Sequence, residues 1–361
     1  MSLIKNILII VQRSNGDVFF SNTLVNHLMK FYARPQIDLL VNDDTLEMAK
    51  LINNVSNIHL FSYKKKQTQP LLQESSIIRK LHKRYDLSIS ITASDRSVLY
   101  SILSGKKSIS VVENSLSKSW WKRLFLSDYY FFDRRKHILF NNLEPLKILN
   151  IPHKDIVLPI NIKASAMNKV KKKLEKLGIK NFLIFHPAAQ YQYKVYPNNL
   201  RNTLLELLNR LKVPIIVTGS NARIDTSISR SLLNFEYIYN FIGKTTIEEY
   251  IALSKLSIGY IGMDTLNMHI ASSQNKRVFA IFGPTNLSTW SPWSNHLKIC
   301  AGDSLPVQTY GEITIFQADL PCVPCGKAGC NDQHDKSLCL DHINPELVYK
   351  EIRNFVNNQK I

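Results

Sequence analysis

The feature that most constrains the fold is the alternation of short, unbroken apolar runs with segments of helical periodicity. The run at 4–11 (IKNILIIV) precedes the helix-like segment 18–32, and a second run follows at 36–41 (QIDLLV). Fully buried parallel strands read as continuous, β-branched apolar runs. Strands that alternate with helices form parallel sheets with right-handed crossovers. The sequence therefore predicts an α/β fold, with further strands at 57–61 and 86–91 and an irregular, aromatic-rich stretch from 104 to 141.

The alternation restarts after Pro159. A basic helix ending at Gly178 is followed by apolar runs and helical segments, the last of them a helix opened by Asn344 and Pro345. A chain of 361 residues suits two domains. We expect Rossmann-like domains at 1–160 and 161–340, and a C-terminal helix in 341–361 that packs back on the first domain. The strand ends should face a shared cleft, where open α/β sheets bind ligands.

The net charge and the cysteine content limit the classes of binding partner and the cellular compartment. The net charge is +18, spread along the chain, which favours a polyanionic partner: nucleic acid, an anionic membrane or a phosphorylated substrate. No nucleic-acid-binding motif is present, so we expect no nucleic-acid partner, and a basic nucleic-acid-binding protein is the distant alternative. The odd number of cysteines, five, favours a reducing compartment. The N-terminal apolar run is too short for a signal peptide, and no apolar run reaches the length of a membrane span. We therefore expect a cytoplasmic protein that contacts the membrane peripherally.

Polar side chains gather where the apolar run 257–262 ends. Asp264 follows the run, Thr265 begins a helical segment, and His269 lies one turn later on the same face as Thr265. The first amides and the dipole of such a helix bind anions. This pattern suits a diphosphate joined to a polyhydroxylated group. The alternative is a capped helix with a buried structural histidine.

Two further strand ends carry candidate catalytic groups. Asp17 follows the first strand at a helix start, where a carboxylate can act as a general base or simply cap the helix. Lys194 lies on the loop after the run 181–187, where it can bind a phosphate as a point charge or be an ordinary surface lysine. Ala188 and Ala189, on the same loop, are small enough to let a ligand approach the backbone.

Two segments have a composition of their own. Cys322, Cys325, Cys330 and Cys339 could hold a structural zinc ion, or be free thiols, or include a disulfide pair. Trp120, Trp121, Lys122 and Arg123 mix aromatic and cationic groups, as segments at a membrane interface do. The alternative for them is an amphipathic helix packed on the first sheet.

Taken in order, several segments resemble glycosyltransferase family 9, the ADP-heptose:lipopolysaccharide heptosyltransferases. They are 15–28 (NGDVFFSNTLVNHL), 186–197 (HPAAQYQYKVYP), 242–272, 278–293 (VFAIFGPTNLSTWSPW) and 322–330 (CVPCGKAGC). The resemblance implies a GT-B fold of two Rossmann-like domains facing a central cleft. It also implies an inverting, metal-independent transfer of heptose from ADP-heptose to the Kdo-lipid A inner core, at the inner face of the cytoplasmic membrane. No cofactor would be required.

The resemblance also assigns roles. Asp17 would be the general base and Lys194 would hold the donor diphosphate. Asp264 would contact the donor sugar, while Thr265 and His269 would lie at the donor phosphates and sugar.

Some positions depart from the family pattern. Leu266 stands where a glycine is usual, and Ala188 and Ala189 stand where several members have hydroxyl residues. Near the turn at Gly219 the closest acid available for the ribose is Asp225. A family 9 transferase with another nucleotide-sugar donor or core acceptor is therefore the alternative.

Overall fold

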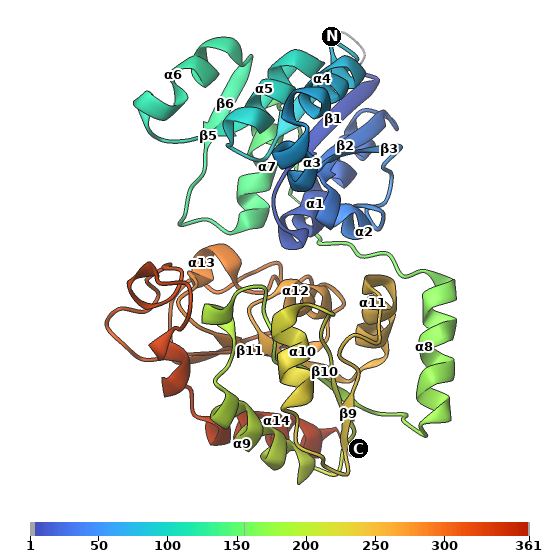
Figure 1. Cartoon of the computed structure of the whole chain (residues 1–361), viewed down its shortest axis with the longest axis vertical. Helices are drawn as coiled ribbons and strands as arrows, with labels where there is room; N and C mark the ends of the chain where they lie inside the picture. Colours follow the sequence, from blue (N-terminus) through green and yellow to red (C-terminus); the bar gives the residue numbers. More distant parts are fainter. Residues whose placement is uncertain (1–3, 155, 360–361) are drawn as a thin grey trace. The chain divides into compact units, whose positions relative to one another are not determined.

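The computed structural model describes residues 4–154 and 156–359 and divides into two compact units, Met1–Asn161 and Ile162–Ile361. The first unit has a parallel sheet with the strand order β3-β2-β1-β4-β5-β6 (Figure 1). This order is that of the Rossmann fold. Its strands are β1 (Asn6–Val11), β2 (Gln36–Asn42), β3 (Asn57–Phe61), β4 (Tyr85–Ser90), β5 (Gly105–Val112) and β6 (Asp128–Phe131).

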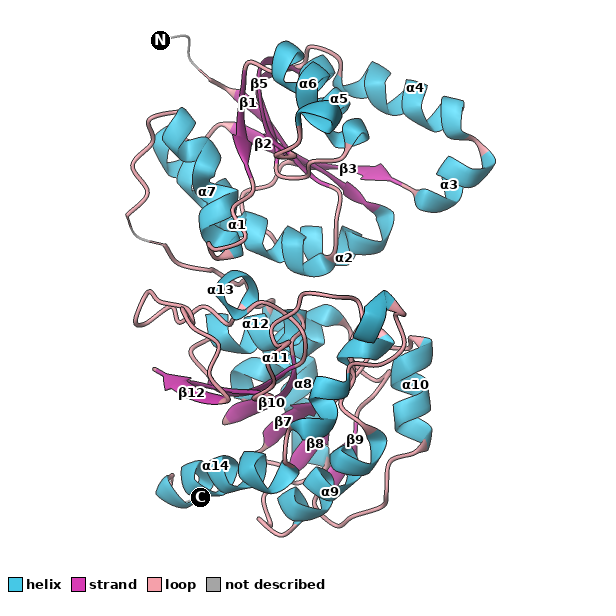
Figure 2. Ribbon diagram, turned by 90° about the vertical axis from the view of Figure 1, so that its left-hand side faces the viewer, coloured by secondary structure: helices cyan, strands magenta, loops and turns pink. Residues whose placement is uncertain are grey.

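Helices cover both faces of this first sheet, as Figure 2 shows. On one face α1 packs against α2 and α7, and on the other α4 packs against α3 and α5, and α5 against α6. Their bounds are α1 (Asn15–Phe31), α2 (Leu46–Ala49), α3 (Tyr63–Thr68), α4 (Pro70–Leu81), α5 (Asp95–Ser104), α6 (Leu116–Phe125) and α7 (Ile138–Ile148). The central strand β1 is buried on both sides, which explains its unbroken apolar sequence.

The stretch 104–141, which the sequence left irregular, contains two more strands of this sheet. β5 reads GKKSISVV, and its serines hide the strand pattern. The backbone N–H of Ser108 donates to Ser127 Oγ at 3.0 Å, and the N–H of Ser127 donates to Ser108 Oγ at 3.2 Å. A buried polar side chain satisfied in this way is compatible with a sheet interior.

The second unit has a seven-stranded sheet with the order β12-β13-β11-β10-β7-β8-β9, parallel except for β12. Its strands are β7 (Leu183–His186), β8 (Ile215–Val217), β9 (Ile238–Asn240), β10 (Gly259–Met263), β11 (Arg277–Phe282), β12 (Val307–Tyr310) and β13 (Ile313–Gln317). Its helices are α8 (Ala164–Lys176), α9 (Asn198–Asn209), α10 (Arg223–Arg230), α11 (Ile247–Leu256), α12 (Leu266–Ser273), α13 (Leu287–Trp290) and α14 (Pro345–Asn358). Parallel strands therefore place their carboxyl ends along one edge of this sheet.

The last helix, α14, is part of the second unit. It packs against α9, and its buried side chains Val348, Ile352 and Val356 join the core formed by β7, β8, β10 and β11. The expectation that this helix also packs back on the first domain stays a prediction. The apolar stripe at i, i+4 and i+8 is satisfied within its own unit.

Within residues 4–154 and 156–359, no helix is both long enough and apolar enough to span a membrane.

Candidate active site

An ion pair joins two of the predicted residues at the carboxyl edge of the second sheet. Lys194 Nζ lies 2.7 Å from Asp264 Oδ2, although the two are far apart in sequence. Lys194 ends the 3-10 turn Gln192–Lys194 after β7, and Asp264 directly follows β10, the neighbour of β7. Burial alone lowers the pKa of the Lys194 amine, but the adjacent Asp264 carboxylate outweighs it and holds that pKa above its usual value. The lysine is therefore a fixed cation.

A buried histidine lies beside this pair and was not among the residues singled out from the sequence. His186 ends β7, and its Nδ1 lies 3.0 Å from Thr218 Oγ1 and 2.9 Å from Asn267 Nδ2. Burial lowers the pKa of His186 to about 4, so its imidazole is neutral near pH 7. Since β8, β7 and β10 are adjacent, this cluster ties three strand ends together.

The start of α12 follows Asp264 directly. Thr265 is the N-cap residue but makes no side-chain cap hydrogen bond, so its hydroxyl is not committed to the helix. Tyr260 Oη lies 3.5 Å from Thr265 Oγ1 and donates to the Met263 carbonyl at 3.1 Å. Leu266 is the first helical residue and is partly exposed, whereas His269, one turn on, is 4% exposed. The helix start thus presents amides and a hydroxyl next to the ion pair.

The other predicted donor residues lie on the loops after β7 and β8. Ala188 and Ala189 are buried after β7. Gly219 follows β8, where a Cβ atom would come within 2.5 Å of Asp225 Oδ1. Asp225 accepts hydrogen bonds from the Ser220 amide at 2.9 Å and the Ser220 hydroxyl at 3.0 Å. Both carboxylate oxygens are thus engaged in holding the β8–α10 loop, and a ribose contact stays a prediction.

Asp17 belongs to the first unit, at the carboxyl end of β1. It is the third residue of α1 and forms a capping box with Ser14: the Ser14 hydroxyl donates to Asp17 Oδ2 at 2.7 Å, and the Ser14 amide does so at 3.2 Å. Arg13 Nε lies 3.6 Å from Asp17 Oδ1. The capping alternative is therefore realised. It does not exclude a catalytic role, because the second oxygen faces only a half-exposed arginine.

The aromatic and basic segment folds as α6, and one of its residues was assigned wrongly. Lys122 is fully buried: its Nζ lies 2.7 Å from Asp95 Oδ1 and 2.8 Å from Glu113 Oε2. It cannot meet a lipid headgroup. Trp121 is half-buried against the small core around Val98.

The neighbouring residues of α6 differ from one another in exposure. Trp120 is 58% exposed. Arg123 is held over the Phe131 ring at 4.9 Å, as a cation–π contact.

The cysteine segment does not assemble the predicted zinc site. All five cysteines are free, and the residues described contain no group of three or more His, Cys, Asp or Glu placed to hold a metal ion. Burial, reinforced by Cys325, Cys330 and Cys322, raises the pKa of Cys339 to about 12. The expectation of a structural zinc ion therefore finds no support.

The sequence is similar to a known protein family and to curated members of it. A family model described as "Glycosyltransferase family 9 (heptosyltransferase)" matches residues 75–316. Among curated proteins, lipopolysaccharide heptosyltransferase 3 of Escherichia coli (strain K12) is 23% identical over 322 residues, which is 86% of this chain and 92% of that protein.

Two solved structures resemble the whole chain. The ADP-heptose LPS heptosyltransferase II of E. coli has a TM-score of 0.71 at 15% identity and covers 99% of this chain and 100% of its own. The E. coli heptosyltransferase WaaC, solved with ADP-2-deoxy-2-fluoro heptose, has a TM-score of 0.70 at 14% identity, with 97% and 99% covered. These likenesses show the fold, which is GT-B. Because the family model spans more than half of the sequence, the chain belongs to glycosyltransferase family 9, a family of heptosyltransferases.

Proposed function

We propose that this protein transfers a heptose from ADP-heptose to the inner core of a lipopolysaccharide, with inversion at the anomeric carbon and without a catalytic metal. The observation that carries the proposal is the Lys194–Asp264 pair beside the start of α12. It offers a fixed cation, a carboxylate and uncapped helix amides at one edge of a parallel sheet, which suits a sugar diphosphate. The similarity to proteins named as lipopolysaccharide heptosyltransferases supports the same assignment.

Each residue has a distinct part in the proposed reaction. Glycosyl transfer passes through an oxocarbenium-like state, and negative charge develops on the departing diphosphate. Lys194 and the α12 amides would neutralise that charge, an effect typically worth about 10²- to 10³-fold in rate. Asp264 would accept hydrogen bonds from the donor sugar. Asp17, in the first unit, would take the proton from the attacking hydroxyl.

Calorimetric titration with ADP-heptose, ADP and other nucleotide sugars, with EDTA present, tests the donor assignment. We expect ADP-heptose to bind and to turn over without added metal, and the anomeric configuration of the product to be inverted by NMR. Lys194→Ala and Asp264→Ala should weaken donor binding. The matched control is Lys172→Ala, an exposed lysine on α8. Tight binding of a different nucleotide sugar instead of ADP-heptose would show that the enzyme uses another donor. Leu266, which stands where the family usually has glycine, is the position that favours this second candidate.

We also propose that α6 rests on an anionic membrane surface, where a lipid-linked acceptor lies. Leu116, Trp120 and Leu124 recur at every fourth position and are 67%, 58% and 69% exposed, with Phe125 beside them at 62%. An exposed apolar stripe flanked by basic residues is typical of helices that lie in a membrane interface.

Co-sedimentation with vesicles containing anionic lipid tests this surface. Leu124→Glu should reduce the bound fraction, while Leu233→Glu, at a site 50% exposed in the second unit, should not. Equal losses in both variants would show that general surface charge, rather than α6, governs binding.

A further inference from the structure

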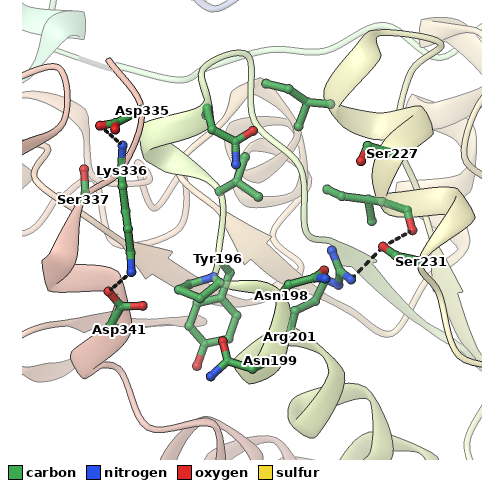
Figure 3. Close-up of a pocket in the computed structure, with 15 residues that line it drawn as sticks. Tyr196, Asn198, Asn199, Arg201, Ser227, Ser231, Asp335, Lys336, Ser337 and Asp341 are labelled. Carbon is green, nitrogen blue, oxygen red and sulfur yellow. Dashed lines mark hydrogen bonds and ion pairs between the residues drawn. The ribbon is translucent and has the colours of Figure 1, made fainter. Parts of the chain in front are cut away.

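A cavity of about 490 Å³ lies within the second unit and takes in none of the residues assigned to the donor (Figure 3). It is walled by the loop before α9 and the first turn of that helix, by one face of α10, and by the segment 335–341. The volume is in the range of small-molecule sites. Apolar side chains of Val195, Ile224 and Ile228 supply part of the wall.

One wall carries a buried cation with no countercharge. Arg201 is 2% exposed and lines the cavity. Its Nε and Nη2 donate to Asn202 Oδ1 at 3.3 and 3.1 Å, and Nη2 also donates to Ser231 Oγ at 3.0 Å. These partners are neutral, and within the described part of the chain Arg201 forms no ion pair. Burial lowers the pKa of Arg201, and no nearby carboxylate offsets it.

A buried guanidinium is unfavourable unless an anion compensates it. The Nη1 group has no hydrogen-bond partner among the described residues, so part of the five-donor fork is left over for a ligand. Such a fork matches the oxygen geometry of phosphate.

The same wall contains the start of α9. The N-cap residue is Pro197, and no side chain caps the helix. Asn198 and Asn199, the first two helical residues, both line the cavity. Uncapped first-turn amides of a helix of this length attract an anion through hydrogen bonds and the helix dipole. The hydroxyls of Ser227 and Ser231 add two further polar groups.

The opposite wall has a different character. Lys336 Nζ lies 2.8 Å from Asp341 Oδ2, and the Lys336 amide donates to Asp335 Oδ1. In Figure 3 these three residues lie across the cavity from Arg201 and Ser231. The charges of Lys336 and Asp341 neutralise each other on this wall, and the carboxylate of Asp335 has no cationic partner among the residues that line it. This wall suits the hydroxyl groups of a ligand and would repel a second anion.

We propose that this cavity binds a small hydroxylated metabolite through a phosphate monoester, which Arg201 and the first turn of α9 hold. The site takes in none of the residues assigned to the donor, but it adjoins that site along the chain: Gln192 and Val195, which line the cavity, open and follow the 3-10 turn that carries Lys194. Occupancy can therefore be sensed by the loop of the catalytic lysine.

Titration calorimetry of the full chain with inorganic phosphate and glycerol 3-phosphate, with glycerol as the uncharged match, tests the proposal. We expect saturable 1:1 binding of both phosphates and none of glycerol. Arg201→Gln should weaken binding by about 10- to 100-fold, the range for a hydrogen bond to a charged group. Because a buried arginine can also matter for folding, Ser227→Asp is the second variant: Ser227 is exposed on α10, and a carboxylate there opposes the anion.

Two controls locate the site. Ser227→Ala should bind phosphate like the unaltered chain. Lys194→Ala should also retain binding, although it disturbs the donor. The proposal is overturned if neither phosphate binds up to about 10 mM, if Ser227→Asp binds as well as Ser227→Ala, or if Lys194→Ala removes binding. The last result would assign the phosphate to the donor site and would leave the proposed transferase function intact.

Discussion

Asp17 can be tested as a general base separately from its role as a helix cap, because the two roles depend on different properties. The cap needs an oxygen that accepts from Ser14, which an asparagine also supplies. The base needs a carboxylate that can take a proton, which an asparagine lacks. Asp17→Asn therefore removes the chemistry and keeps the cap, whereas Asp17→Ala removes both.

The magnitudes follow from the contacts. Asp17→Asn gives up the charge interaction with Arg13, which at 3.6 Å and with a half-exposed arginine is worth about 0–1 kcal/mol. Asp17→Ala also loses the capping box and should cost about 0.5–2 kcal/mol of stability. Both should lower the transfer rate by about 10²- to 10⁴-fold, the usual contribution of a positioned base. Activity and stability should thus separate in the asparagine variant.

The assay is the initial rate of transfer from ADP-heptose, together with urea unfolding of each variant. Glu249→Gln is the matched control, since Glu249 occupies the same position in the capping box that Thr246 makes at the start of α11. This control should keep full activity. If Asp17→Asn retains more than about a tenth of the rate, well outside the range for a lost base, Asp17 is a cap and the base lies elsewhere.

Three further outcomes test the remaining structural assignments. Lys122→Met should destabilise the protein by about 2 kcal/mol in urea unfolding, because charged hydrogen bonds are lost, yet leave vesicle binding unchanged; a drop in vesicle binding would contradict its burial. Ile352→Ala should cost about 2–5 kcal/mol, since the side chain is fully buried in the core of the second unit, and a cost under 1 kcal/mol would contradict that placement. His186 has a folded-state pKa of about 4 against an ordinary 6.5, so the unfolded chain takes up the proton first as the pH falls; stability should drop by about 3 kcal/mol between pH 6.5 and 4, and His186→Gln should flatten that dependence.

The strand and helix order was largely predictable because parallel strands buried on both faces leave a strong local signal. The run 4–11 became β1, and 257–262 became β10. β5 was not recognised because its two buried serines interrupt the apolar run, and the partner of Ser108 is Ser127, 19 residues further along the chain.

The site was only half predictable, because its parts meet through strand order. Sequence placed Lys194 and Asp264 at two strand ends, but their 2.7 Å contact requires β7 and β10 to be neighbours. Asn267 and Thr218 reach His186 for the same reason. Adjacency of strands distant in the chain is a tertiary property, and the alternation of apolar runs carries no information on it.

The position of α14 has a consequence for how the chain is made. The first unit is complete by Asn161, so it can fold as soon as it leaves the ribosome. The second unit needs Val348, Ile352 and Val356 to close its core. Throughout synthesis of the second half, the apolar surface that α14 covers on α9 stays open. A nascent chain that stalls before α14 would therefore carry one folded unit and one incompletely folded unit with exposed apolar surface. Chaperones and proteases recognise intermediates of this kind.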